Sequence, residues 1–167
     1  MAAQTGRTVS RWTRLIVDDS TGTLREPAFD SLSVCGIVYE EKDTTAFQDA
    51  IANALPGMPS CPIDITGPFD NSPLVAIATS GNAPAISGSH LVLQPINGLY
   101  TPLALGLLIG IGHYWETGEP VFGITGTATN GFICTKYTVD FASMKYSASF
   151  RVKSGSASPA WGTAIIS

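Results

Sequence analysis

The sequence predicts a mainly β protein, an antiparallel β-sandwich or barrel of about seven strands with one flanking α-helix. Apolar and small residues alternate with period two over several separate stretches, as in strands that bury one face. A single stretch, residues 45–55, has the apolar spacing of a helix. A chain of 167 residues with 44% hydrophobic content can form one core, so we expect a single domain over residues 1–167.

The first elements are an extended N-terminal arm and a strand over residues 12–17. Asp18, Asp19 and Gly22 follow and are typical of a tight turn, because Asp side chains bond their own backbone and glycine adopts positive φ. A cation site at the paired aspartates is the alternative. A second strand is predicted within residues 31–41, with Gly36 at a β-bulge.

Residues 45–55 carry the pattern of an amphipathic helix. Thr45 and Gln48 form a capping box, and Pro56 with Gly57 ends the segment. The apolar stripe consists of Phe47, Ala50, Ile51, Ala54 and Leu55. We expect this stripe to lie on a sheet.

The middle of the chain alternates between strand and loop signals. A strand through residues 63–65 closes at Gly67 and Pro68. Residues 72–88 are rich in Ser, Ala, Gly, Asn and Pro and predict a long loop, which in an assembling protein often reaches a neighbour. A short helix or irregular segment is expected at 89–97.

The segment 103–112 is apolar but has period two, with bulky residues on one face and mostly Gly and Ala on the other. A membrane-spanning helix needs about twenty apolar residues, so this segment predicts a strand and no membrane partner. Its small-residue face would allow another backbone to come close. Three further strands in meander order are predicted from residue 121 to residue 152.

Motifs for catalysis or metal binding are absent from the sequence. His90 and His113 are the two histidines and lack the spacing of a metal site. The cysteines Cys35, Cys61 and Cys134 are far apart and predict buried thiols. We expect no enzyme activity, no cofactor and no bound metal.

Charge is scarce and unevenly distributed. Charged residues make up 13% of the chain, about half the usual share, and none lies between Asn71 and Trp115. The net charge of −4 offers no general attraction to nucleic acid, so no specific nucleic-acid binding is expected. This composition indicates that part of the surface faces other protein rather than water.

Three stretches together resemble tail tube proteins of tailed bacteriophages and related phage head and tail structural proteins. They are "LIVDDSTGTLRE" (15–26), "VYEEKDTTAFQDAIANALPGMPSCPIDITGPFDN" (38–71) and "KYTVDFASMKYSASFRVKSGSASPAWGT" (136–163). The resemblance implies a β-sandwich with a flanking helix that forms homo-oligomeric, typically hexameric, rings stacked around a DNA channel. It also implies contact with other tail or major capsid proteins and a location in the virion.

Two alternatives stay open beside a tail tube subunit. A capsid decoration protein, usually a trimer bound to assembled heads, belongs to the same structural class. A carbohydrate-binding β module would use exposed aromatic residues such as Tyr100, Tyr114 and Trp115. The first residues lack the apolar core of a secretion signal, which predicts synthesis in the host cytoplasm before assembly.

The small-residue strand and the aromatic residues beside it form the predicted contact surface between subunits. Its residues are Leu103, Leu105, Gly106, Leu108, Gly110, Tyr114, Trp115 and Trp12.

Overall fold

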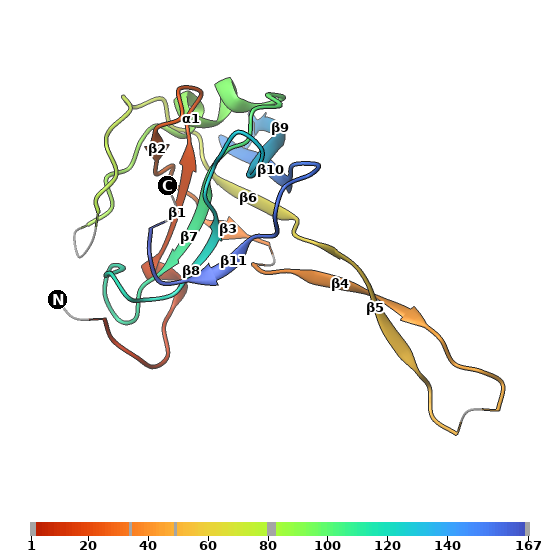
Figure 1. Ribbon diagram of the computed structural model, residues 1–167. Coiled ribbons are helices and arrows are strands. Elements are labelled where there is room, and N and C mark those ends of the chain that lie inside the picture. Colours follow the sequence, from red (N-terminus) through yellow and green to blue (C-terminus); the bar gives the residue numbers. More distant parts are fainter. Residues whose placement is uncertain (1–2, 34, 49, 80–82, 166–167) are drawn as a thin grey trace.

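Two antiparallel sheets pack face to face, and a two-stranded hairpin projects from them (Figure 1). This computed structural model describes residues 3–33, 35–48, 50–79 and 83–165. The mainly β, antiparallel fold with one helix is confirmed, although the described residues form eleven strands and the sheets do not close into a barrel.

The larger sheet has the strand order β11-β8-β7-β1-β2. Its strands are β1 (Thr13–Asp18), β2 (Leu24–Arg25), β7 (Leu105–Ile109), β8 (Val121–Ile124) and β11 (Ala160–Gly162). Both faces are apolar. Leu15 and Leu107 belong to the main core, whereas Ile16 and Leu108 lie on the opposite face under Trp115. Burial on both faces explains why β1 and β7 are nearly continuous apolar runs.

The smaller sheet has the order β3-β6-β10-β9 and covers the main core from the other side. Its strands are β3 (Ser31–Leu32), β6 (Ile63–Pro68), β9 (Phe132–Asp140) and β10 (Lys145–Val152). Strict alternation puts Ile63 and Ile65 inside on β6, and Tyr146, Ala148 and Phe150 inside on β10. One buried face and one exposed face produce this period of two.

The single α-helix among the described residues, α1 (Ser89–Ile96), closes one end of the core, and a short 3-10 helix (Ser10–Trp12) precedes β1. Val92, Leu93 and Ile96 share its buried face. The Ser89 hydroxyl donates to the Pro68 carbonyl oxygen (2.9 Å) and accepts from the Asp70 amide (3.1 Å), which ties the first turn to the end of β6. The sequence predicts a short helix or an irregular segment at 89–97, and the structure has the helix.

The helix predicted at residues 45–55 is wrong. These residues belong to a projecting hairpin formed by β4 (Val38–Asp43) and β5 (Ala54–Ser60), whose strands pair from Val38 with Ser60 to Asp43 with Ala54 (Figure 1). An amphipathic helix of this length is stable chiefly when its apolar stripe lies on a core, and no core lies beside the hairpin. Backbone pairing between the strands replaces it. Residue 49 lies outside the described part.

Side chains of the larger sheet hold the described part of residues 72–88, the segment predicted as a long loop. The described residues 73–79 and 83–86 form no regular secondary structure. Ser87, which follows them, forms a single β-bridge with Pro27. Arg14 Nη2 donates to the Ala78 carbonyl oxygen (2.9 Å), and Arg25 Nη1 donates to that of Val75 (3.0 Å). The loop therefore lies against the body of the protein, and Ile77 packs on the outer face of the sheet.

Candidate assembly interface

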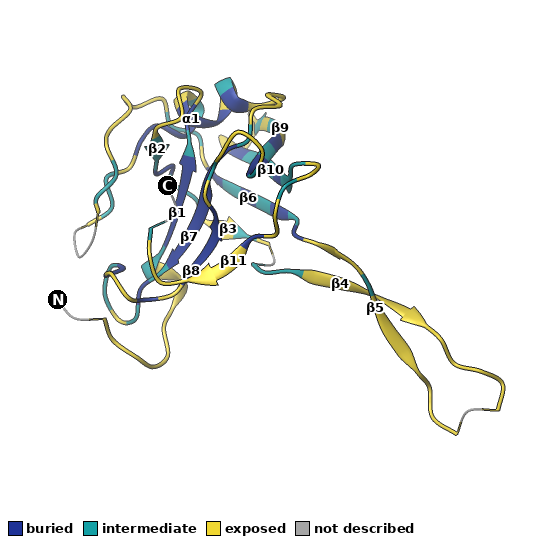
Figure 2. Cartoon of the chain, in the orientation of Figure 1, coloured by how far each residue is buried: buried dark blue, intermediate teal, exposed yellow. Residues whose placement is uncertain are grey.

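The projecting hairpin, β4 and β5 with the residues that connect them (38–60), is called the arm below. Every described residue of the arm is exposed except Gly57, which is half-buried (Figure 2). Gly57 sits where the register shifts, and a Cβ there would lie 2.9 Å from the Glu40 carbonyl oxygen. The end of the hairpin is closed by the Asn53 amide, which donates to Thr45 Oγ1 (2.8 Å).

The arm exposes several large apolar side chains to water. Phe47 at the tip is completely exposed, and Met58 and Ile51 are 80% and 77% exposed. Leu55 and Tyr39 are more than half exposed as well. An isolated two-stranded hairpin is at best marginally stable in water, and an exposed apolar surface usually marks a contact site.

The arm is also strongly acidic. It carries Glu40, Glu41, Asp43 and Asp49 but a single basic residue, Lys42. Its charge of −3 is therefore most of the chain's net −4. A partner surface for the arm needs apolar area and positive charge together.

The structure buries most of the predicted contact surface within the chain itself. The buried residues are Leu103, Leu105, Gly106, Leu108, Gly110 and Trp115. Gly106 on β7 does allow another backbone to come close, but that backbone is β8 of the same chain. A Cβ on Gly123 of β8 would lie 2.8 Å from the Gly106 Cα. Contact between subunits at these positions stays a prediction, and their side chains are not accessible in the single chain.

Trp12 and Tyr114 are the two members of that surface that are only half-buried. Their rings meet edge to face with centroids 5.2 Å apart, and the Arg11 guanidinium lies 4.9 Å from the centroid of a Trp12 ring. The aromatic residues proposed for carbohydrate binding do not share one exposed face, because Trp115 is 1% exposed. Its indole Nε1 donates to the Glu119 carbonyl oxygen (3.1 Å).

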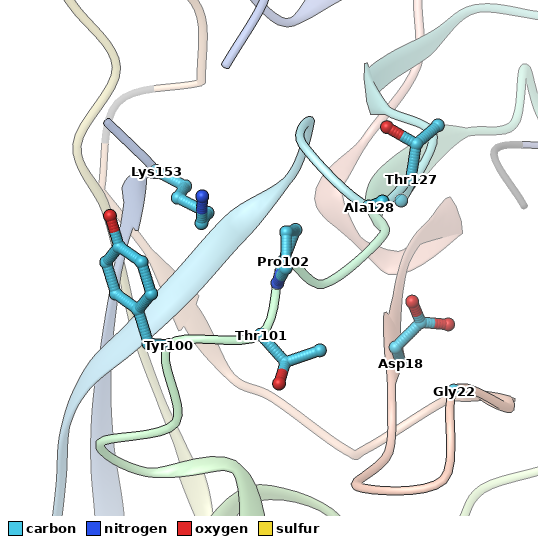
Figure 3. A pocket seen from close by; sticks show the side chains of 9 residues that line it. Asp18, Gly22, Tyr100, Thr101, Pro102, Thr127, Ala128 and Lys153 are labelled. Carbon is cyan, nitrogen blue, oxygen red and sulfur yellow. The ribbon is translucent and has the colours of Figure 1, made fainter. Parts of the chain in front are cut away.

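An open pocket of about 830 Å³ lies between four segments of the body, and sequence analysis did not predict it (Figure 3). The segments are 18–22, 100–102, 126–128 and the start of the C-terminal segment at Lys153. Lys153 Nζ lies 4.6 Å from the Tyr100 ring centroid. Tyr100 and Lys153 lie at one end of the pocket and Asp18 at the other (Figure 3).

The paired aspartates form a turn, as predicted. Asp19 Oδ1 accepts hydrogen bonds from the amides of Thr21 (2.8 Å) and Thr23 (3.1 Å), and Oδ2 accepts one from Arg25 Nε (2.8 Å). Burial alone would raise the pKa of the Asp19 carboxyl. A hydrogen bond from the Thr21 hydroxyl to Oδ1 (2.6 Å), together with the three bonds above, outweighs burial and lowers the pKa to about 2. The carboxylate thus stabilises the turn and the start of β2.

Replacing Asp19 with asparagine is expected to lower the free energy of unfolding at pH 7 by about 2 kcal/mol. The pKa is depressed in the folded state, so the carboxylate stabilises the fold above the unfolded value of 3.8, and this contribution is lost as the pH falls toward about 2. Urea unfolding of both proteins at several pH values checks this. The two stabilities should converge in acid; a difference that does not depend on pH would contradict the assignment.

Clusters of possible metal ligands and the three cysteines are the remaining candidates for chemistry. Within the described residues, no three His, Cys, Asp or Glu side chains come together as a metal ion would require. Cys61 and Cys134 are buried, Cys35 is half-buried, and all three are free thiols. Burial raises the pKa of Cys35 and of Cys134 to about 11, which makes both poor nucleophiles. The eight-residue helix is too short to span a membrane, and the described residues form no longer one.

Comparison with known proteins identifies the fold but no sequence relative. No protein-family model matches the chain, and no curated protein matches it in sequence. Similar solved structures are parts of tail-like injection particles. One is a chain of the anti-feeding prophage (AFP) baseplate, with a TM-score of 0.56 and 8% identity over 95% of this chain and 97% of that chain.

Two further structures extend the likeness to other parts of such particles. The sheath/tube terminator of the PVC extracellular contractile injection system matches with a TM-score of 0.50 and 13% identity, over 96% of this chain and 99% of that one. The AFP tube-terminating cap matches with a TM-score of 0.52 and 11% identity, over 98% and 97%. At these identities the likeness establishes the fold and assigns no role to this chain.

Proposed function

We propose that this chain is a structural subunit of a phage-tail-like particle, where it forms rings on the axis of the tail tube. The observation that carries the proposal is the arm, an exposed apolar hairpin on a fold shared with tail-particle components. The arm contributes nothing to the core of its own chain. Its contacts must come from another subunit.

The energetics of the arm support association. Covering an exposed large apolar side chain stabilises a complex by about 1.5–3 kcal/mol before the costs of association. The arm offers five such side chains, namely Tyr39, Phe47, Ile51, Leu55 and Met58. Together they can offset the loss of translational and rotational freedom when one subunit binds the next.

The sheet edges support a ring as well. β9 is nine residues long and, among the described residues, pairs with a strand on one side only, apart from the bridges of Phe132 and Cys134. An unpaired edge of this length is a template for another chain. The acidic balance suits a subunit near DNA, because a channel must let DNA pass without holding it.

Sedimentation velocity at several concentrations, followed by electron microscopy, tests the proposal. Rings, most simply hexamers, are expected at high concentration. Long hollow cylinders would identify a tube subunit, and single rings would identify a subunit at an end of the tube. Trimers that bind only assembled heads would instead support capsid decoration. A monomer at every concentration would exclude a self-assembling subunit.

Removing the apolar side chains of the arm tip with the double substitution Phe47→Ser and Ile51→Ser is expected to raise the concentration needed for assembly at least about tenfold and to leave the fold intact. Both side chains touch no core residue, so the free energy of unfolding should change by less than about 0.5 kcal/mol. Phe141→Ser is the matched control, because Phe141 is an exposed aromatic outside the arm (83%). If the double variant assembles as well as the wild type, the arm tip does not mediate assembly.

A further inference from the structure

We infer that the pocket end formed by Tyr100, Pro102 and Lys153 receives the arm tip, around Phe47, of a second copy of this chain. The inference rests on the proposed function and names the surface that the arm contacts. Figure 3 shows this end of the pocket, with the Tyr100 ring and the Lys153 side chain beside Pro102. The arm is thus one half of a contact, and the pocket is the other half.

The arm tip defines what its receptor must provide. Phe47 is fully exposed and needs an apolar slot of its own size. The tip follows a strand with three carboxylates, Glu40, Glu41 and Asp43. A matching site therefore combines aromatic or aliphatic walls with a cation that no carboxylate of its own chain already neutralises.

The pocket meets both requirements. Tyr100 is 66% exposed, and Pro102 and Ala128 add apolar wall. Four basic side chains of the body, Arg14, Arg25, Lys145 and Arg151, are paired with carboxylates. Lys153, like Arg7, Arg11 and Lys136, has no carboxylate of the described residues within salt-bridge distance. Of these four side chains it is the one that lines the pocket, where it lies over Tyr100. Asp18, at the other end, already accepts the Ala104 amide at 2.7 Å.

Backbone hydrogen bonds within the chain hold the walls of the pocket in place. Leu103 and Phe132 exchange two backbone hydrogen bonds (2.8 and 2.9 Å), which fix the segment that carries Pro102. The Lys153 amide donates to the Gly131 carbonyl oxygen (3.0 Å), which fixes the lysine backbone beside it. Preorganisation lowers the cost of ordering a receptor on binding.

The arm cannot fill the pocket of its own chain, because it extends away from the two sheets and its tip lies at the far end (Figure 1). The contact is therefore between two different surfaces, the arm of one copy and the pocket of the next. Contacts of this kind propagate head to tail and close into a ring when the rotation allows. A ring is the arrangement that the proposed function requires.

Mixing two defective variants tests the pairing. The arm variant carries Phe47→Ser with Ile51→Ser, and the pocket variant carries Tyr100→Ser with Lys153→Glu. Each alone is expected to need at least about tenfold higher concentration to assemble than the wild type. An equimolar mixture should form one-to-one heterodimers and stop there, because each pair retains a single intact arm and a single intact pocket. Arg7→Glu is the matched charge-reversal control, because Arg7 is exposed and lies outside the arm, the pocket and β9, and it should assemble normally.

The outcomes separate this inference from the proposed function. If the wild type stays monomeric, both fail. If the wild type assembles and the pocket variant assembles equally well, the inference alone fails. A mixture that stays monomeric while the wild type assembles also overturns the pairing. A photo-crosslinking residue at position 47 gives a second measurement: cross-links are expected at 100–102 or 127–128 of another copy, and cross-links confined to other segments contradict the site.

Discussion

Replacing Glu26 with glutamine is expected to lower the free energy of unfolding by about 3–5 kcal/mol, because it leaves a buried guanidinium without a counter-charge. Arg14 on β1 donates through Nε to Oε1 (2.9 Å) and through Nη2 to Oε2 (2.8 Å) of Glu26, and both residues are 2% exposed. Arg14 Nη1 is buried without a partner among the described residues, so the site has no spare acceptor. Urea unfolding measures the loss, and the m-value should be the same for both proteins, so that a shift of the midpoint reports stability alone.

An exposed ion pair provides the control for Glu26→Gln. Lys145 Nζ lies 2.6 Å from Asp30 Oδ2, with side chains 53% and 39% exposed, so Asp30→Asn should cost less than about 1 kcal/mol. The double substitution Arg14→Met with Glu26→Leu should recover most of the stability, since it removes both charges. If Glu26→Gln and Asp30→Asn lower the free energy of unfolding equally, the Arg14–Glu26 pair is not shielded from water.

The same ion pair has a consequence for the long loop. Arg14 Nη2 also binds the Ala78 carbonyl oxygen, and the Ser87 amide donates to the Glu26 carbonyl oxygen (2.9 Å). The buried guanidinium thus holds the loop at Ala78, and a main-chain hydrogen bond independent of the Glu26 side chain holds it at Ser87. Glu26→Gln should accordingly increase amide exchange in the loop as well as lower global stability.

The sequence predicted most elements of the body because their signals are local. Period two marked β6 and β10, and the side chain of Asp19 marked the turn between β1 and β2. The arm was mistaken for a helix because Phe47, Ile51 and Leu55 have helical spacing. A sequence shows which residues are apolar, but it does not show whether the surface that covers them belongs to the same chain.

The same limit applies to the predicted contact surface, because a strand of small residues can pack against its own chain or against a second subunit. Gly106 and Gly123 let neighbouring strands of one chain approach, and the sequence pattern would be identical if the approaching backbone belonged to a second subunit. The pocket was missed because its walls come from segments that lie up to 135 residues apart, from Asp18 to Lys153. A periodicity or motif within one segment cannot predict a pocket whose walls come from several segments.

Gly110→Glu should unfold the protein rather than only block association. A Cβ at Gly110 would lie 2.1 Å from the His113 carbonyl oxygen and 2.8 Å from the Trp115 amide nitrogen. Both are backbone atoms of the turn that places Trp115 over the outer face of the larger sheet, so neither can move without disturbing that packing. Overpacking at such a position costs about 1–3 kcal/mol or more, and the buried carboxylate adds several kcal/mol.

Gly162→Glu is the matched control for Gly110→Glu. Gly162 is exposed on β11, and a Cβ there would meet no atom within 4 Å, so its melting temperature should stay close to that of the wild type. Thermal melts followed by circular dichroism and the yield of soluble protein measure both variants. If Gly110→Glu folds normally and only its assembly is lost, the turn at 110–115 must open in solution, and Gly110 would then lie between subunits. Lost assembly together with a lost melting transition instead assigns Gly110 to the core of the single chain.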